Sequence, residues 1–328
     1  MARRYIGEMG PGERIDDQVF LIASKDLRTT TQGGLYIHAV LADRTGQVPG
    51  RMWQASEQMF ETLPEGGFAR FKGRTENYKG SLQFIIEGIR PVRTDEVELA
   101  EFLPRTDKDV DAMWARVTQI LGRIAHPDLR RLVDKFLADE ELMGRFRTAP
   151  AAITLHHSYL GGLLEHTLNL LELALLVIPR YPELNPDLMV AGLFLHDIGK
   201  TAELTYQTSF GYTDPGQLLG HLVQATLWIE EKCALIEADT GKPFPEPLKW
   251  VLQHIVLSHH GKHEFGSPKL PAIPEAIAIH HLDNLDAKVK MFLTEIEKDR
   301  DPQSNWSNYN RVLETKVYKV DVANHRPA

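Results

Sequence analysis

The sequence Leu-Phe-Leu-His-Asp-Ile-Gly-Lys at residues 193–200 places a histidine and an aspartate at the end of an apolar run. The apolar pattern predicts a helix over 186–198, and Gly199 can supply the turn that ends it. Buried polar groups cost free energy unless they find partners. His196 and Asp197 are therefore the first candidates for a functional site, with Lys200 beside them.

Further histidines and aspartates lie on both sides of this doublet, in a chain that contains 14 histidines. The clusters are His156 and His157, His166, His221, His259 and His260, and His280, His281, Asp283 and Asp286. Imidazole and carboxylate groups are ligands of Zn, Fe, Mn and Co, and separate helices can bring them together in a bundle. A bound cation gives all these groups one common partner, so the pattern predicts a metal site. We interpret His38 and His126 as ordinary polar residues.

The sequence around these clusters has the apolar spacing of helices. Prolines lie between the segments or at their starts, where helices tolerate them. The predicted helices span 113–124, 129–147, 159–178, 186–198, 216–238, 246–259 and 274–297.

The first 95 residues differ from the rest, because β-branched and aromatic residues partly alternate over 15–93. About five strands are expected, with a short helix at 55–63 between the third and the fourth, which is the outline of an OB-fold barrel. The segment LADRTGQVPGRMW at 41–53 resembles the second hairpin of nucleic-acid-binding OB domains. The predicted class is a multi-domain α+β fold, with a five-stranded OB barrel (1–95), a helical connector (96–150), an all-α domain with the metal site (151–300) and a tail (301–328).

OB domains stack bases on aromatic side chains and contact phosphates with basic ones. The candidates for nucleic-acid binding are Tyr36, Phe71, Lys72, Arg74 and Tyr78. A place in the barrel core is the alternative for Phe71, and a solvated face is the alternative for Lys72 and Arg74.

Composition limits the remaining choices. The net charge of −8 argues against a generally basic coat for nucleic acid. The single cysteine, Cys233, excludes an internal disulfide framework and fits a reducing compartment. The most apolar run, 170–179, is too short to span a membrane, and the N-terminus lacks a signal-peptide core. We therefore expect a cytoplasmic protein without a membrane partner.

The order His, His-Asp, His, His, Asp resembles the HD-domain superfamily of metal-dependent phosphohydrolases over about 150–295. The resemblance implies that His166, His196, Asp197 and Asp283 hold metal, with Asp283 preferred over Asp286. His221 and His259 match the additional histidines of family members with two metals, and His260 is the alternative to His259. It also implies two divalent cations (Mn, Co, Fe, Ni or Zn), with Asp197 and Lys200 as catalytic residues.

The stretches HHSYLGGLLEHT and LSHHGKHEFGSPK, behind an OB domain, resemble the YhaM-type 3′–5′ exoribonucleases over nearly the whole chain. This resemblance implies a phosphodiesterase that acts on single-stranded RNA or DNA, and a homo-oligomer. Two alternatives stay open at this point. One is a phosphohydrolase of small nucleotides or cyclic dinucleotides with a regulatory OB domain, and the other is a non-catalytic nucleic-acid-binding protein with a structural metal.

Overall fold

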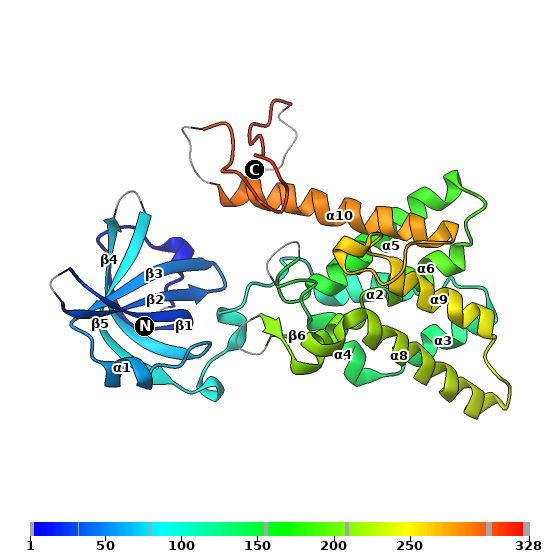
Figure 1. The fold of residues 1–328 in the computed structure, drawn as a ribbon, viewed down its shortest axis with the longest axis horizontal. Coiled ribbons are helices and arrows are strands. Elements are labelled where there is room, and N and C mark those ends of the chain that lie inside the picture. The colour runs from blue at the N-terminus through cyan, green and yellow to red at the C-terminus, as the bar shows by residue number, and fades with distance from the viewer. Residues whose placement is uncertain are drawn as a thin grey trace. The chain divides into compact units, whose positions relative to one another are not determined.

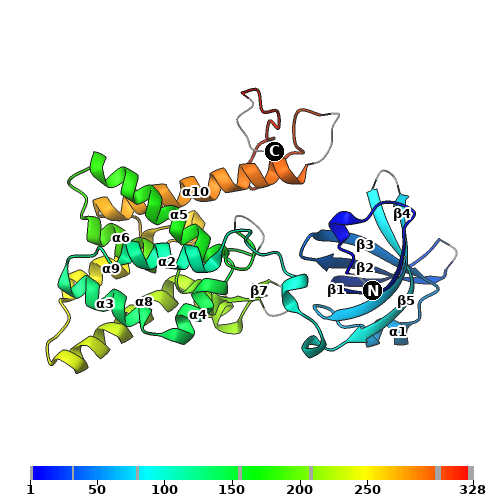
Figure 2. The same ribbon diagram turned by 180° about the vertical axis from the view of Figure 1, so that it is seen from behind.

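The computed structural model describes residues 3–31, 33–78, 81–153, 157–206, 210–299 and 304–323. The chain forms two compact units. Unit 1 comprises residues 1–107 and 205–211, and unit 2 comprises 108–204 and 212–328. Unit 1 contains the barrel and unit 2 contains the long helices (Figures 1 and 2). The predicted α+β class, with a barrel first and helices after it, is confirmed.

Unit 1 is a closed five-stranded barrel with the strand order β1-β2-β3-β5-β4. Its strands are β1 (Arg14–Thr29), β2 (Leu35–Asp43), β3 (Gly46–Trp53), β4 (Phe68–Tyr78) and β5 (Ser81–Val92). Neighbouring strands pair antiparallel except β3 and β5, whose parallel pairing closes the barrel. Helix α1 (Glu57–Thr62) lies between β3 and β4, as predicted, and the Ser56 hydroxyl accepts a hydrogen bond from the Met59 N–H at its start. Short 3-10 turns complete the unit: η1 (Ile6–Glu8), η2 (Thr94–Glu96) and η3 (Leu99–Glu101).

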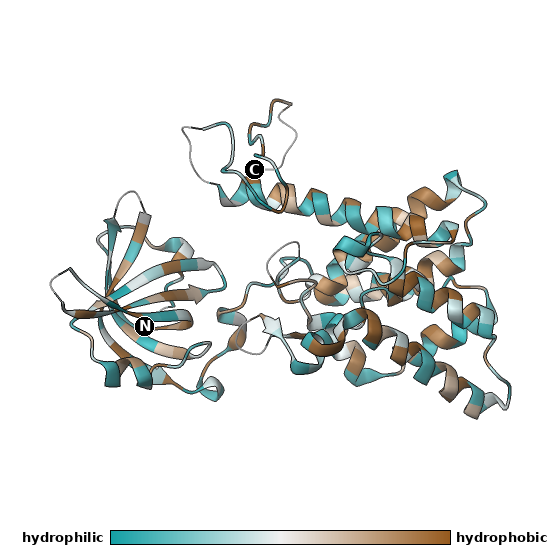
Figure 3. Cartoon of the chain, in the orientation of Figure 1, coloured by the Kyte–Doolittle hydropathy of each residue, from teal (hydrophilic) through white to brown (hydrophobic). Residues whose placement is uncertain are grey.

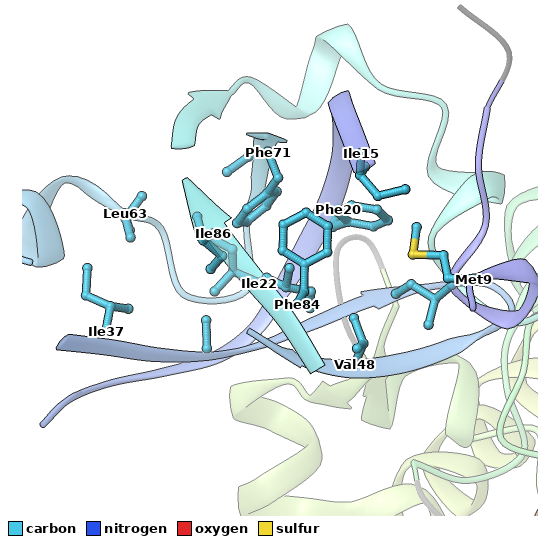
Figure 4. Packing of buried hydrophobic residues seen from close by; sticks show 14 residues of the cluster. Met9, Ile15, Phe20, Ile22, Ile37, Val48, Leu63, Phe71, Phe84 and Ile86 are labelled. Carbon is cyan, nitrogen blue, oxygen red and sulfur yellow. The ribbon is translucent and has the colours of Figure 1, made fainter. Parts of the chain in front are cut away.

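Aromatic rings fill the barrel, because alternate residues of each strand point inward. The rings of Phe20, Phe71 and Phe84 lie against one another, with centroids 5.8 to 6.4 Å apart (Figure 4). Hydrophobic and hydrophilic residues alternate in places along the barrel strands (Figure 3). Phe71 is only 1% exposed. Its predicted nucleic-acid-binding role is therefore wrong, since a ring enclosed in the core cannot stack on a base.

The predicted connector 96–150 is divided between the two units. Phe102 packs on Phe68 with ring centroids 4.7 Å apart, and the N–H of Arg44 donates to the carbonyl of Glu101. These contacts attach the residues up to 107 to the barrel. The rest of the segment forms α2 (Val110–Leu121), α3 (Pro127–Leu137) and α4 (Glu140–Thr148), which pack within unit 2.

Unit 2 continues with α5 (Gly162–Val177), η4 (Ile178–Arg180), α6 (Pro186–Leu195), α7 (Lys200–Glu203), α8 (Asp214–Thr240), α9 (Glu246–Ser258), η5 (His263–Phe265) and α10 (Pro274–Lys298). The two-residue strands β6 (Leu204–Thr205) and β7 (Gly211–Tyr212) pair with each other at the two ends of the segment 205–211. The predicted helix 129–147 is two helices, α3 and α4. The helix restarts because the Asp139 carboxylate accepts a hydrogen bond from the Leu142 N–H. The other predicted helices are present, with ends that differ from the prediction by up to three residues.

Helices α5 and α6 form the centre of unit 2. Every residue of α6 from Met189 to Leu195 is buried, and α5 packs against α2, α4, α6 and α10. Among the described residues, the stretch Gly162–Arg180 is long and apolar enough to cross a membrane by length and composition alone, and half of it is buried inside the structure. The apolar run 170–179 therefore belongs to a longer helix than its own length predicted, and this helix packs in the core of unit 2.

The described part of the tail, 304–323, forms turns with two isolated bridges, Trp306 to Tyr318 and Asn310 to Thr315. Asn310 donates to Glu295 at 2.9 Å and Lys319 pairs with Asp299 at 2.9 Å. These contacts attach the tail to the end of α10.

Candidate metal centre

Helices that are distant in sequence bring their histidines to one carboxylate, that of Asp197. Asp197 is the second residue after the end of α6 and is 2% exposed. Its Oδ2 lies 3.4 Å from Nε2 of His196 and 3.7 Å from Nε2 of His166 on α5. Its Oδ1 lies 3.5 Å from Nε2 of His221 on α8 and 3.4 Å from Nε2 of His259 at the end of α9. The structure thus places four histidines from four parts of unit 2 on the two oxygens of one carboxylate.

The opposite ring nitrogen of each histidine has a hydrogen-bond acceptor of its own. Nδ1 of His196 donates to the carbonyl of Leu193 at 2.7 Å, and Nδ1 of His259 donates to the carbonyl of Val256 at 2.8 Å. Nδ1 of His166 lies 2.8 Å from Asp286, and Nδ1 of His221 lies 2.9 Å from Glu203. In a neutral ring with Nδ1 as the donor, Nε2 carries the lone pair, and all four Nε2 atoms face Asp197. Metal-ligating histidines usually have this arrangement.

Whether a cation fits the site can be judged from its buried polar atoms. Nε2 of His196, Nε2 of His221 and Oδ1 of Asp197 are buried and have no hydrogen-bond partner among the described residues. Each such atom costs about 1–3 kcal/mol when it stays unsatisfied. Imidazole nitrogens and carboxylate oxygens are donors that suit Zn, Mn, Fe, Co and Ni. The residues present therefore fit divalent cations of this kind.

The electrostatics favour a charged carboxylate at Asp197 and neutral rings at His259 and His260. Burial opposes the charge on Asp197, but Lys200 and His196 outweigh it and hold its pKa well below the usual range. Burial lowers the pKa of His259, and it lowers that of His260 to about 3. These two rings are neutral at neutral pH, which leaves a nitrogen lone pair available to a metal.

The pKa of His166 is shifted in the opposite direction from those of His259 and His260. Burial opposes its positive charge, but hydrogen bonds to Asp283 and Asp286 outweigh burial and raise its pKa to about 9. Without a cation the proton on His166 therefore balances the nearby carboxylates, and a metal ion can replace that proton.

The structure separates the two aspartates of α10. Oδ1 of Asp283 lies 3.2 Å from Nε2 of His166, on the side of Asp197. Asp286 lies at the opposite edge of the His166 ring, where its Oδ2 contacts Nδ1 of His166 and Nε2 of His157. Asp283 thus faces the centre and Asp286 faces away from it.

Both histidines of the pair at 259 and 260 border the centre. Ligand atoms of His221, His259 and His260 lie within 4.8 Å of one another, as do those of His166, His196 and Asp197. His260 is anchored by its Nδ1, 2.8 Å from the carbonyl of Phe265. Asp197 belongs to the second group, and its Oδ1 faces two histidines of the first, His221 at 3.5 Å and His259 at 3.4 Å.

Lys200 belongs to the site, since its Nζ lies 2.6 Å from Oδ2 of Asp197. His156 lies outside the described residues. Sequence reasoning missed Glu203 and Asn169, which contact His221 and Asp286. Asn169 follows His166 by one helical turn and therefore shares its face. Glu203 follows Lys200 by three residues, but no local pattern links it to His221.

The barrel surface carries a second set of candidates. Tyr36 on β2 lies opposite Trp53 on β3, with ring centroids 5.0 Å apart. The guanidinium of Arg51 lies 4.8 Å from the ring centroid of Tyr78. Trp53 and Tyr78 are 45% and 44% exposed. Sequence reasoning missed Arg51 and Trp53. The pairing of β2 with β3 places Trp53 opposite Tyr36, and only the tertiary structure brings Arg51 to Tyr78.

Lys72 and Arg74, also predicted to bind nucleic acid, are exposed on β4, the strand that also carries Tyr78. Lys72 pairs with Asp16 at 3.7 Å and Arg74 pairs with Glu87 at 3.1 Å. Acidic neighbours thus offset both positive charges.

The buried histidine and aspartate centre lies in a helical segment that matches a known family model, since residues 163–288 match the model described as HD domain. The chain is 32% identical over 288 residues to the 3′-5′ exoribonuclease YhaM of Bacillus subtilis (strain 168), covering 88% of this chain and 89% of that protein. It is 35% identical over 288 residues to the 3′-5′ exoribonuclease YhaM of Geobacillus sp. (strain WCH70), covering 88% and 86%. The chain belongs to the YhaM family.

Among solved structures, the second OB-fold domain of replication protein A from Methanococcus maripaludis matches 28% of this chain and 95% of that domain, at 18% identity and a TM-score of 0.22. Asparaginyl-tRNA synthetase from Pyrococcus horikoshii matches 48% of this chain and 38% of that chain, at 12% identity and a TM-score of 0.24. Scores of this size support no inference about this chain.

Proposed function

We propose that this chain is a metal-dependent 3′–5′ exoribonuclease that acts on single-stranded RNA. The observation that carries the proposal is the convergence of four imidazole Nε2 atoms on the two oxygens of Asp197. Membership of the YhaM family supports the reaction, since the two relatives compared are named 3′-5′ exoribonucleases.

Two divalent cations are proposed, one on each side of Asp197. His166, His196, Asp197 and Asp283 would hold the first. Asp197, His221 and His259 would hold the second, with His260 as a further donor. Asp197 is suited to bridging because each of its oxygens faces a different pair of histidines.

When bound, such cations supply Lewis-acid activation of water and neutralise phosphodiester charge. The chain itself contributes positioning and charge. Lys200 keeps its proton, because the attraction of Asp197 outweighs burial and raises the Lys200 pKa. We assign Lys200 to the stabilisation of negative charge on the phosphoryl group.

The barrel is proposed to bind the single strand. Tyr36, Trp53 and Tyr78 offer aromatic faces for bases, and Arg51 offers a positive charge among them. The face formed by strands 2 and 3 is where OB domains bind oligonucleotides. Because bases are held by stacking, single-stranded DNA is a second substrate to be tested.

The test begins with metal analysis of the purified protein. Single-stranded RNA labelled at its 5′ end is then incubated with added Mn²⁺, and products are separated on a gel. A ladder that shortens stepwise from the 3′ end is expected, and EDTA should abolish it. Internal cuts, or cleavage of small nucleotides and cyclic dinucleotides but not RNA, would contradict the proposal.

A further inference from the structure

The four central histidines differ in what holds their outer nitrogen. His196 and His259 donate Nδ1–H to a carbonyl three residues earlier in their own segment, at 2.7 and 2.8 Å. His166 and His221 instead donate to carboxylates from other elements, those of Asp286 and Glu203. A backbone carbonyl three residues earlier is present at this position whatever the sequence. A carboxylate acceptor, in contrast, requires an acidic residue at a particular position of another element.

Asp286 is held at the centre of a small network. Its Oδ2 accepts from Nδ1 of His166 at 2.8 Å and from Nε2 of His157 at 2.9 Å, and its Oδ1 accepts from Asn169 at 3.1 Å. Asp283 lies one turn earlier on α10 and faces the other nitrogen of the His166 ring at 3.2 Å. Two carboxylates three residues apart on one helix thus fix both nitrogens of one imidazole.

Glu203 has the matching place beside His221. Its Oε1 accepts from the backbone N–H of His221 at 3.0 Å and lies 2.9 Å from Nδ1, and its Oε2 lies 3.0 Å from Nδ1. The backbones around this contact are tightly packed. A Cβ on Gly216 would lie 2.2 Å from the carbonyl of Glu203, and a Cβ on Gly199 would lie 2.2 Å from the carbonyl of His221. The Glu203 side chain is therefore held against the kink of α8, where Gly220 has a positive φ of 73°.

We propose that Asp286 and Glu203 are positioning residues that orient His166 and His221, and that each controls the affinity of a different cation. This inference rests on the proposed two-cation site. A carboxylate on the outer nitrogen fixes the tautomer and makes the inner nitrogen more basic. Asp286 contacts His166, which faces Oδ2 of Asp197. Glu203 contacts His221, which faces Oδ1 of Asp197. Each carboxylate therefore acts on one half of the centre.

The test uses the isosteric variants Asp286→Asn and Glu203→Gln in the full chain, with Mn²⁺ binding followed by calorimetry. Wild-type protein should bind two Mn²⁺ ions. Each variant should weaken one binding step by about 10- to 100-fold and leave the other step unchanged. The double variant should weaken both steps.

The matched control is Glu230→Gln, which removes an α8 carboxylate that pairs with Lys249 at 2.7 Å, away from the centre. It should bind Mn²⁺ as the wild type does. The melting temperature without metal confirms that each variant is folded. The alanine variant at either position should weaken its binding step more than the isosteric variant does. The amide oxygen of the isosteric variant still accepts from the histidine, whereas alanine offers no acceptor.

The outcomes distinguish failure of the positioning role from failure of the proposed exoribonuclease function. If wild-type protein binds two ions and degrades RNA but both variants bind like the wild type, the positioning role is wrong and the proposed function stands. If each variant weakens both steps equally, the carboxylates only support the fold and the inference is also overturned. If the wild type binds no metal and degrades no RNA, the proposed function fails together with the inference.

Discussion

The centre of unit 2 and the surface of the barrel both gather polar and aromatic side chains, but they hold them differently. Around Asp197 the side chains are buried, and the Nε2 atoms of His196 and His221 and one oxygen of Asp197 lack partners among the described residues. On the barrel, Trp53 is exposed and Arg74 has an acidic neighbour.

The difference shows why one region could be recognised more easily than the other. Buried polar groups without a partner cost free energy, so they persist where something binds them. Exposed aromatic and basic residues cost little, so their presence alone indicates no ligand.

The sharpest test of this contrast is removal of the central carboxylate. Asp197→Ala should lower RNA hydrolysis by at least about 10³-fold and reduce the bound metal, because four imidazoles lose the carboxylate they face. Single-turnover assays and metal analysis measure both effects. The control is His281→Ala, which removes an exposed histidine of α10 and should leave activity unchanged. Full activity of the Asp197 variant would refute the site.

The next test concerns the core of the barrel. Phe71→Ala should destabilise unit 1 by about 3–5 kcal/mol, because the ring is enclosed between Phe20 and Phe84. Chemical denaturation measures the loss. Phe71→Leu, which keeps most of the volume, should lose less. If Phe71→Ala is as stable as the wild type but binds RNA more weakly, the ring contacts RNA and its place in the core is wrong.

A smaller effect is expected on the barrel surface. Trp53→Ala should weaken binding of a long single-stranded RNA by about 10-fold, because one stacked base is worth about 1–3 kcal/mol. Hydrolysis of a small chromogenic phosphodiester should not change. Arg74→Ala is the comparison variant on β4. If Arg74→Ala weakens RNA binding more than Trp53→Ala does, the single strand contacts β4 more than the aromatic pair on β2 and β3.

No effect is expected at Cys233, which lies on α8 together with His221. Burial raises the pKa of its thiol to about 12, so the reactive thiolate is scarce at pH 8. Iodoacetamide should leave the folded protein unmodified and active at this pH, and it should label the protein once urea unfolds it. Mass spectrometry reads both states, and rapid labelling of folded protein would show that the thiol is accessible.

Much of the fold and of the centre could be predicted from local pattern. Alternation predicted the barrel, and apolar spacing predicted most of the helices, because both are set by neighbours along the chain. The break between α3 and α4 was missed because a single capping carboxylate, Asp139, decides it. The boundary after residue 107 was missed because it depends on Phe102 packing on Phe68, a contact between distant residues.

The sequence by itself determined the residue types of the centre, since histidines and aspartates within apolar helices require a common partner. Only the tertiary structure decided which residue faces which. It placed Asp283 on the inner nitrogen of His166 and Asp286 on the outer one, and it brought Glu203 to His221. The physical reason is that spacing along a helix tells which residues share a face, whereas the atom each one meets depends on how the helices pack.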